Sequence, residues 1–361
     1  MGAATKPRSW DTVGVPLSIA SAQALWEPSG TYLNTASFGL PPRPAWDALQ
    51  AALDDWRTGR TSWEPWGEAT EEARRSFARL IAVDPSTVAV GATVSGHVGL
   101  VAASLPNDSR VLAPEVEFAS TLFPFLAQAH RGVTVRMVPA SELADAIDDS
   151  TDVVAFSAVQ MATGEVADLE AIAGAAKAHG ALTLVDATQA CGWLPLDGSR
   201  FDIVVVAGYK WLLSPRGTAF MAVAPGRLDE IIPVTASWYG GEDVHTSYFG
   251  PPLRLATDAR RLDTSPAWHS WIGAAAAMAV IEEIGVDAIH EHDLRLANRF
   301  RAGLGLGSGN SAIVFVDAPD AEERLERAGI RAAIRNGRLR TSWHLYNSDE
   351  DVERALEALQ V

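Results

Sequence analysis

The stretch Phe201-Asp-Ile-Val-Val-Val-Ala-Gly-Tyr-Lys210 places a lysine at the end of an apolar run. A lysine at the end of a buried strand must find a partner or lose its charge. The earlier stretch Leu182-Thr-Leu-Val-Asp186 ends in the same way on an aspartate. Two strands that bring an amine and a carboxylate to one sheet edge indicate a site where Lys210 forms a Schiff base and Asp186 pairs with a protonated heterocycle. This pairing is typical of pyridoxal phosphate chemistry. Taken singly, Asp186 could instead cap the turn after its strand, and Lys210 could extend its charged end to solvent.

The chain around these two strands alternates short β-branched runs with alanine-rich, helix-periodic stretches from about residue 87 onward. Such alternation is the pattern of βαβ units and predicts a mostly parallel sheet in an α/β domain. We expect a helix over 169–179 that is stopped by Gly180. Seven strands are expected, at 88–90, 110–113, 133–138, 153–157, 182–185, 203–206 and 219–223.

The alternation stops after Trp238-Tyr-Gly-Gly241 and Pro251-Pro252. Beyond it the pattern predicts a smaller α+β unit, with helices at 268–284, 288–304, 320–328 and 349–359 and strands at 312–316 and 338–342. With 361 residues the chain is long enough for two domains. We therefore expect an N-terminal arm (1–20) that packs with the small domain, a large cofactor-binding domain (21–255) and a small C-terminal domain (256–361).

Composition limits the classes of partner. The 29 Lys and Arg residues against 45 Asp and Glu residues give 29 − 45 = −16, which opposes binding to nucleic acid or anionic lipid. Cys191 is the only cysteine, so no intrachain disulfide and no cysteine metal cluster can form. No segment has the length and apolarity of a membrane span or a signal peptide. We predict a cytoplasmic protein without membrane or nucleic-acid partners.

A second candidate feature is Val90-Gly-Ala-Thr-Val-Ser-Gly96, where a strand gives way to a helix. Unpaired backbone N–H groups and the positive end of the helix can receive a phosphate there. Thr93 and Ser95 add hydroxyl donors. The alternative is a simple helix N-cap without a ligand. Its position ahead of Asp186 and Lys210 in the chain favours the phosphate site.

Taken together, these segments resemble the class V aminotransferase family of fold-type-I pyridoxal-phosphate enzymes. That family includes cysteine desulfurases, kynureninases, isopenicillin-N epimerase-like proteins and carbon–sulfur lyases. The resemblance implies the three-layer fold of these enzymes and a homodimer with active sites at the subunit interface. It is carried, in the expected order, by Tyr32-Leu-Asn-Thr-Ala-Ser-Phe-Gly39, Val185-Asp-Ala-Thr-Gln189, Gly208-Tyr-Lys-Trp-Leu212, Pro215-Arg-Gly217, Leu339-Arg-Thr-Ser342 and Tyr346-Asn347.

The resemblance also implies a role for each matching residue around the cofactor. Lys210 would carry the cofactor, Asp186 would pair with its ring nitrogen and Gln189 would contact its phenolic oxygen. The other implied cofactor-binding residues are Ala92 and Thr93 at the phosphate, Phe118 stacked on the ring, Gln160 near the cofactor oxygen and the substrate, and Tyr209 beside the lysine.

Two further residues are assigned by the same resemblance. Arg340 falls where relatives bind the substrate α-carboxylate, a role that suits a bidentate guanidinium. Thr264 falls in a segment that reaches the phosphate of the neighbouring subunit. The chain departs from the family pattern at Tyr209 and Ala207, where relatives have histidine and a phosphate-binding serine, and at Asp263, where they have glycine.

The expected substrate is an L-α-amino acid whose Cα proton is taken by Lys210. Loss of a β-substituent, as in a carbon–sulfur lyase, is the preferred outcome, and aminotransfer and epimerisation are the alternatives. A persulfide-forming cysteine desulfurase is disfavoured, because residues 260–361 contain no cysteine and Cys191 is expected to face the interior. The alternative from another class is a catalytically silent protein that binds the cofactor.

Other motifs have a structural explanation beside the functional one. His290 and His292 are two positions apart and cannot share a helix face, so surface positions are expected rather than a metal site. His97 is expected to pack near the phosphate loop. Trp63 and Trp66 could roof the active site or could pack the N-terminal segment.

Overall fold

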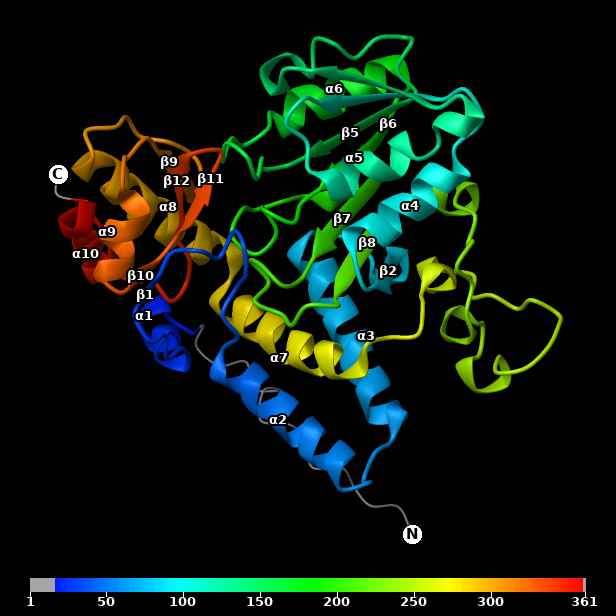
Figure 1. The fold of residues 1–361 in the computed structure, drawn as a ribbon. Helices are drawn as coiled ribbons and strands as arrows, with labels where there is room; N and C mark the ends of the chain where they lie inside the picture. The colour runs from blue at the N-terminus through cyan, green and yellow to red at the C-terminus, as the bar shows by residue number, and fades with distance from the viewer. Residues whose placement is uncertain (1–16, 360–361) are drawn as a thin grey trace.

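The computed structural model describes residues 17–359 (Figure 1). Most of the predicted N-terminal arm, residues 1–16, therefore lies outside the described residues. Within them the chain forms a large α/β unit and a smaller α+β unit side by side. The boundary predicted at 255/256 stays a prediction, because segments from both sides of it cross between the two units.

The large unit is built on a seven-stranded sheet. Only β8 runs against its neighbours, and the other six strands share one direction. All seven predicted strands are present, which confirms the mostly parallel sheet. In spatial order they are β2 (Val88–Gly91), β8 (Ala219–Val223), β7 (Ile203–Ala207), β6 (Leu182–Asp186), β5 (Val153–Ser157), β3 (Arg110–Pro114) and β4 (Thr134–Val138).

Helices cover both faces of this sheet, and strand alternation decides which residue faces which layer. On β7, Val204 and Val206 belong to the core under α3, α6 and α7, whereas Ile203 and Val205 belong to the core under α4 and α5. This arrangement is the expected three-layer fold. The helices are α2 (Arg43–Arg57), α3 (Trp63–Leu80), α4 (Val94–Ser104), α5 (Ala119–Leu126), α6 (Leu169–His179) and α7 (Trp268–Ile284).

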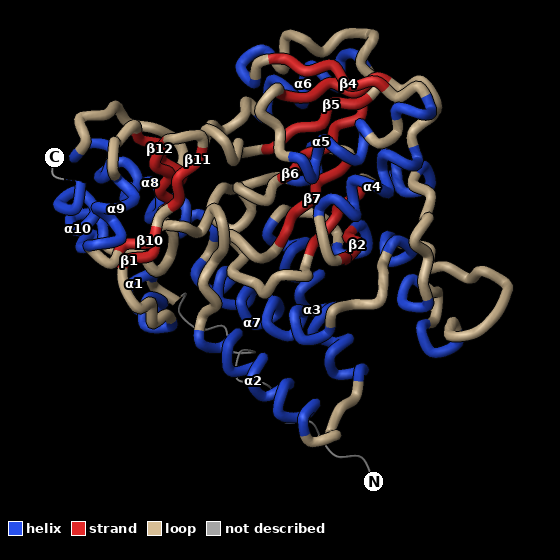
Figure 2. Tube along the Cα trace, viewed as in Figure 1, coloured by secondary structure: helices blue, strands red, loops and turns tan. Residues whose placement is uncertain are grey.

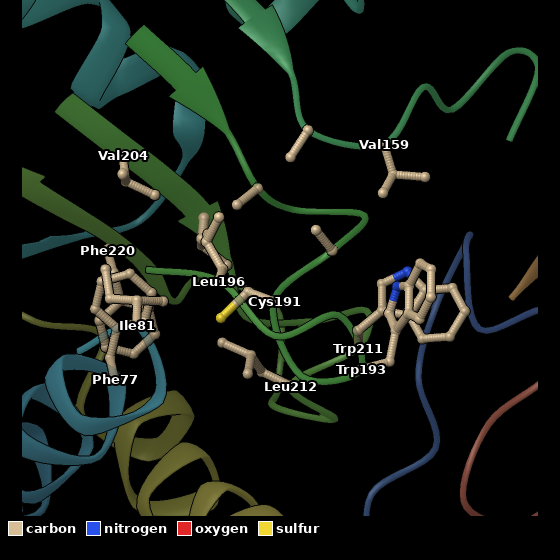
Figure 3. Packing of buried hydrophobic residues seen from close by; sticks show 14 of the residues in the cluster. Phe77, Ile81, Val159, Cys191, Trp193, Leu196, Val204, Trp211, Leu212 and Phe220 are labelled. Atoms are coloured by element: carbon tan, nitrogen blue, oxygen red, sulfur yellow. The ribbon is translucent and has the colours of Figure 1, made fainter. Parts of the chain in front are cut away.

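Two details show how the sequence fixes these layers. Asp168 caps α6 by accepting a hydrogen bond from Ala171 N, and Gly180 ends the helix with a left-handed φ of 69°. The larger core cluster combines aliphatic and aromatic side chains (Figure 3). In it the rings of Phe77 and Phe220 stack with centroids 4.5 Å apart, and Cys191 is buried among apolar side chains.

The smaller unit contains a three-stranded antiparallel sheet in the order β11-β12-β9, labelled in Figure 1 and drawn in red in Figure 2. The strands are β9 (Ile313–Val316), β11 (Ala333–Arg335) and β12 (Arg338–Ser342), and the helices are α8 (Val286–Gly303), α9 (Ala321–Arg327) and α10 (Asp349–Leu359). β1 (Thr31–Tyr32) pairs in parallel with β10 (Ile330–Arg331), and the short α1 (Ile19–Ala22) precedes it. The N-terminal segment is thereby joined to the small unit.

A buried contact fastens the small unit beside Lys210. His344 Nδ1 lies 2.8 Å from Asp293 Oδ2, and its Nε2 lies 3.2 Å from the carbonyl oxygen of Trp211. Trp211 follows the lysine directly, so the small unit is held next to the predicted site. Among the described residues, no helix is both long and apolar enough to cross a bilayer.

Candidate active site

A cavity of about 130 Å³ opens at the carboxyl ends of β5, β6 and β7. Parallel strands commonly place ligand sites at this edge of an α/β sheet. Seven of the ten predicted site residues line it, and Gln160, Thr264 and Arg340 do not. The lining residues are Ala92, Thr93, Val94, Ser95, Phe118, Ser120, Ser157, Met161, Asp186, Thr188, Gln189, Ala207, Tyr209, Lys210 and Arg216.

Lys210 is buried, with 5% of its surface exposed. Burial lowers the pKa of its amine to about 8, the guanidinium groups of Arg340, Arg216 and Arg335 lower it further, and Asp186 opposes them. Its Nζ lies 5.5 Å from the centroid of the Phe118 ring. Lys210 can therefore present a neutral amine near physiological pH, which is the state that a nucleophile or base requires.

Asp186 ends β6 with both carboxylate oxygens held by neighbours. Oδ2 accepts a hydrogen bond of 2.9 Å from Thr121 Oγ1, and Oδ1 accepts one of 2.9 Å from Thr188 N. These two donors fix the orientation of the buried carboxyl group. Thr121 comes from α5, which covers the face of the sheet opposite the core that contains Val204. No signal in the sequence linked Thr121 to Asp186.

The predicted phosphate loop has the geometry of an N-capped helix end. Thr93 Oγ1 accepts from Gly96 N at 3.1 Å, and Ser95 Oγ donates to Thr93 Oγ1 at 3.3 Å. The first N–H groups of a helix have no intrahelical partner, so those of Val94 and Ser95, which line the cavity, are available to a ligand. Because the loop also lines the cavity of Lys210, a cap and a phosphate site are compatible here.

His97 packs behind this loop, as expected. Its ring lies against Gly91, where a Cβ would come within 2.9 Å of the imidazole. Burial lowers the pKa of His97 to about 4, and its Nε2 lies 3.3 Å from the carbonyl oxygen of Ala219. A neutral, hydrogen-bonded imidazole supports the packing of the loop.

Glu117 is a buried acid that sequence reasoning missed. Its carboxyl group accepts hydrogen bonds from Ser157 N (2.7 Å), Ser157 Oγ (2.5 Å), Gln160 Nε2 (2.9 Å) and Phe118 N (2.7 Å). Burial raises its pKa, with a smaller contribution from the charge of Asp186. The residue fixes the backbone of Phe118, whose ring is partly exposed toward Lys210.

The two predicted glutamines are placed differently. Gln160 is bound to Glu117 and stands outside the cavity lining, so its predicted contact with the cofactor stays a prediction. Gln189 does line the cavity. Its Oε1 accepts from Trp211 Nε1 at 2.8 Å and its Nε2 donates to Ala36 O at 3.0 Å, which leaves one amide N–H for a ligand.

Arg340 is a buried guanidinium without an acidic partner among the described residues. Only 1% of it is exposed, and its Nε and Nη1 atoms have no hydrogen-bond partner. Its Nη2 donates to Ser37 Oγ at 2.6 Å. Burial, and then the charge of Arg335, lowers the pKa of Arg340 to about 10. A buried cation of this kind favours an anionic ligand.

The segment 34–39 places Ser37 beside Arg340. Gly39 N donates to Tyr209 O at 2.9 Å, and a Cβ on Gly39 would collide with the carbonyl oxygen of Lys210. Only glycine allows this close approach. The resemblance of residues 32–39 to the family was the one signal that could have pointed to Ser37.

Thr264 lies beside a buried ion pair rather than in the cavity. Its neighbour Asp263 pairs with Arg74 at 2.6 Å and accepts from Val90 N at 2.7 Å. Asp263, which departs from the family pattern, thereby ties this segment to β2. The predicted contact of Thr264 with a partner subunit stays a prediction.

The aromatic and histidine motifs fall outside the cavity. Trp63 packs on Trp238, Trp268 and His245, in agreement with the packing alternative. The expectation of surface positions for His290 and His292 is wrong. Both are partly buried, because His290 stacks on Trp193 and His292 Nε2 lies 3.1 Å from Asn347 O. Within 17–359 no group of His, Cys, Asp and Glu could hold a metal.

Comparison with known proteins identifies the family. The model of the family described as Aminotransferase class-V matches residues 57–326. The chain belongs to this family. It is a pyridoxal-phosphate-dependent enzyme, and the resemblance found in its motifs is confirmed.

Two relatives are similar to this chain over nearly its whole length. One, an uncharacterized aminotransferase of Bacillus subtilis, is 30% identical and covers 91% of this chain and 93% of its own. The other, the isopenicillin N epimerase of Streptomyces clavuligerus, is 29% identical over 94% and 96%. Among solved structures, a cystine C–S lyase bound to cysteine persulfide has a TM-score of 0.82 at 22% identity and covers 92% of this chain and 97% of its own. At 22% identity, this structural match supports the fold alone.

Proposed function

We propose that this class V enzyme acts on an L-α-amino acid and eliminates a sulfur substituent from its β-carbon. The observation that carries the proposal is that two buried basic groups lie near each other: the amine of Lys210, whose pKa burial lowers to about 8, and the guanidinium of Arg340, whose Nε and Nη1 have no hydrogen-bond partner among the described residues. The amine suits proton transfer at Cα, and the guanidinium suits an α-carboxylate.

The cofactor would lie between the phosphate loop and Asp186. When bound, pyridoxal phosphate supplies an aldehyde that captures amino groups and a cationic ring that withdraws electrons from the bonds at Cα. Asp186 would hold the ring nitrogen protonated, and Phe118 would cover one face of the ring. Thr93 and Ala92 would receive the phosphate, with the backbone N–H groups that start α4.

Lys210 and Arg340 would divide the work on the substrate. Arg340 would fix the α-carboxylate and so set the orientation of the Cα–H bond. The neutral Nζ of Lys210 would then remove the proton from Cα. Gln189 would donate its remaining N–H to the cofactor. Tyr209 would border the site where relatives have histidine.

Elimination is preferred over persulfide formation because it needs no sulfur acceptor from the protein. A desulfurase of the persulfide type needs an accessible thiol. Cys191, the only cysteine, is buried, and burial raises its pKa to about 12. Aminotransfer and epimerisation use the same residues and remain the alternative reactions.

The Schiff-base role has a sharp test, because the chain has only three lysines, Lys6, Lys177 and Lys210. Borohydride treatment of the holoenzyme should abolish its visible absorption band and label Lys210 alone in peptide mass spectrometry. Lys210→Ala should lose both signals, and the matched control Lys177→Ala should keep both. A label on another lysine, or a band that persists in Lys210→Ala, contradicts the role.

The reaction is tested with S-alkyl-L-cysteines as substrates. Release of pyruvate and ammonia in equal amounts is expected. Conversion of the cofactor to its amine form without ammonia would favour aminotransfer. Solvent deuterium at Cα of otherwise unchanged substrate would favour epimerisation.

We further propose a homodimer. Apolar side chains are exposed along the segment between β8 and α7, where a loop reaches away from the body of the molecule (yellow-green in Figure 1). Phe249 is 89% exposed and Leu253 is 74% exposed. Contiguous apolar exposure of this kind marks association surfaces. Light scattering coupled to size exclusion should give twice the 38.4 kDa chain mass. The cytoplasmic location stays a prediction.

A further inference from the structure

Two guanidinium groups converge on one hydroxyl beside the site. Ser37 Oγ accepts from Arg340 Nη2 at 2.6 Å and from Arg335 Nη2 at 3.3 Å. The register of the small sheet explains this convergence. Ala333 lies opposite Arg340 and Arg335 lies opposite Arg338, so these four residues share one face of the β11–β12 hairpin.

Of the three arginines on this face, one forms a salt bridge with an acidic residue of the described chain and two do not. Arg338 pairs with Asp317, with Nε and Oδ1 2.7 Å apart. Neither Arg335 nor Arg340 has an acidic partner within salt-bridge distance in residues 17–359. The two cations also repel each other and Lys210, since each lowers the pKa of the lysine and Arg335 lowers that of Arg340.

An α-carboxylate would neutralise only one of these two charges. Arg340 is buried and Arg335 is exposed at the tip of the hairpin, so the inner and outer cations are distinguishable. Arg335 Nη1 donates to the carbonyl oxygen of its own neighbour Ile334 at 2.8 Å, and a guanidinium has five N–H donors, so further donors of Arg335 remain for a ligand. An outer guanidinium next to an occupied inner one can receive a second anion from the same small molecule.

We propose that the substrate is an L-α-amino acid with a second anionic group, a carboxylate on its side chain, and that Arg335 binds this group. The inference rests on the proposed assignment of the α-carboxylate to Arg340. Ser37 would hold the two guanidiniums at a fixed separation and so select the spacing between the two anions. The class of substrate is thereby narrowed to dicarboxylic amino acids.

A matched pair of ligands tests the second anion on the holoenzyme. S-carboxymethyl-L-cysteine and S-carbamoylmethyl-L-cysteine have nearly the same shape and differ by one charge. Binding is followed by the change in the absorption spectrum of the cofactor, and pyruvate release is measured separately. The carboxylate is expected to bind roughly tenfold more tightly than the amide, the value of one charge-assisted contact.

Variants on the same hairpin locate the contact. Arg335→Gln should weaken binding of the carboxylate about tenfold and leave binding of the amide unchanged. Arg338→Gln removes the same charge from the same face at a position already paired, and it should retain the ratio of the wild-type enzyme. Thermal melting of both variants checks that the hairpin is folded.

The outcomes separate this inference from the proposed function. Equal binding of both ligands to the wild-type enzyme, or an equal loss for both in Arg335→Gln, overturns the second anion site while the amino-acid enzyme stands. If no amino acid changes the spectrum of the cofactor, the proposed function fails and this inference fails with it.

Discussion

At the scale of single residues, the site depends on how burial changes two basic groups. Lys210 loses proton affinity because its amine is enclosed by strand and loop and faces three guanidiniums. Arg340 stays charged at neutral pH, because burial lowers its pKa only to about 10 and its Nη2 donates to Ser37 Oγ. The amine of Lys210 can therefore lose its proton near physiological pH, whereas the guanidinium of Arg340 remains a cation that can bind an anion.

The first prediction concerns the pH dependence of cofactor capture. The neutral amine is the reactive form, so the rate at which the apoprotein binds pyridoxal phosphate should rise with pH through an apparent pKa of about 8. Arg340→Gln removes a neighbouring positive charge and should move this profile to higher pH. Stopped-flow absorbance from pH 6 to pH 10 measures both, with Arg338→Gln as the unshifted control. A midpoint near that of a free lysine would refute the enclosed amine.

The second prediction concerns Glu117. Glu117→Gln replaces one accepting oxygen by an N–H that faces the donors Ser157 N and Gln160 Nε2. We expect the free energy of unfolding to fall by about 1–3 kcal/mol, the cost of leaving buried donors unsatisfied. Urea denaturation measures the loss. The exposed Glu353→Gln is the control and should stay within about 0.5 kcal/mol. An unchanged Glu117→Gln would mean that the four contacts are not maintained in solution.

At the scale of elements, a buried ion pair joins segments that are distant in the chain. Arg74 of α3 binds Asp263, which also binds the edge strand β2. Burial raises the pKa of Asp263 to about 6, although the positive charge of Arg74 acts to lower it. The start of the phosphate loop, the segment with Thr264 and helix α3 are therefore held as one unit.

The third prediction follows from this pair. Asp263→Ala leaves the buried guanidinium of Arg74 with the partly exposed Glu71 as its one acidic partner in residues 17–359, and it should lower the free energy of unfolding by about 3–5 kcal/mol. Asp55→Ala breaks the exposed pair with Arg60 and should cost no more than about 1 kcal/mol. Urea denaturation compares them. Recovery of stability in the double variant Arg74→Met/Asp263→Ala would trace the loss to the unpaired charge, and equal losses in Asp263→Ala and Asp55→Ala would contradict it.

At the scale of the whole molecule, two contacts place the small unit over the site. β1 joins β10 in parallel, and the buried His344 links Asp293 to the backbone that follows Lys210. These contacts hold Arg335 and Arg340 near Lys210. The surface that we propose for the dimer is the loop with Phe249.

The fourth prediction tests that surface. The double variant Phe249→Asp/Leu253→Asp places two charges in the proposed apolar contact and should shift the enzyme toward the monomer in light scattering. Leu306→Asp, at a partly exposed leucine of the small unit, should remain dimeric. A dimer that survives both aspartates would exclude this loop from the interface.

The sequence by itself determined the strands of the large sheet, some helices such as α6 and α7, and the ends of the strands that carry Asp186 and Lys210. Those features follow from local apolar periodicity, which depends on residues close in the chain. Only the tertiary structure decided that Arg335 and Arg340 meet at Ser37, that Glu117 holds Phe118 and Gln160, and that Asp263 meets Arg74. These residues are brought together by the packing of distant elements, so no local pattern records their contacts.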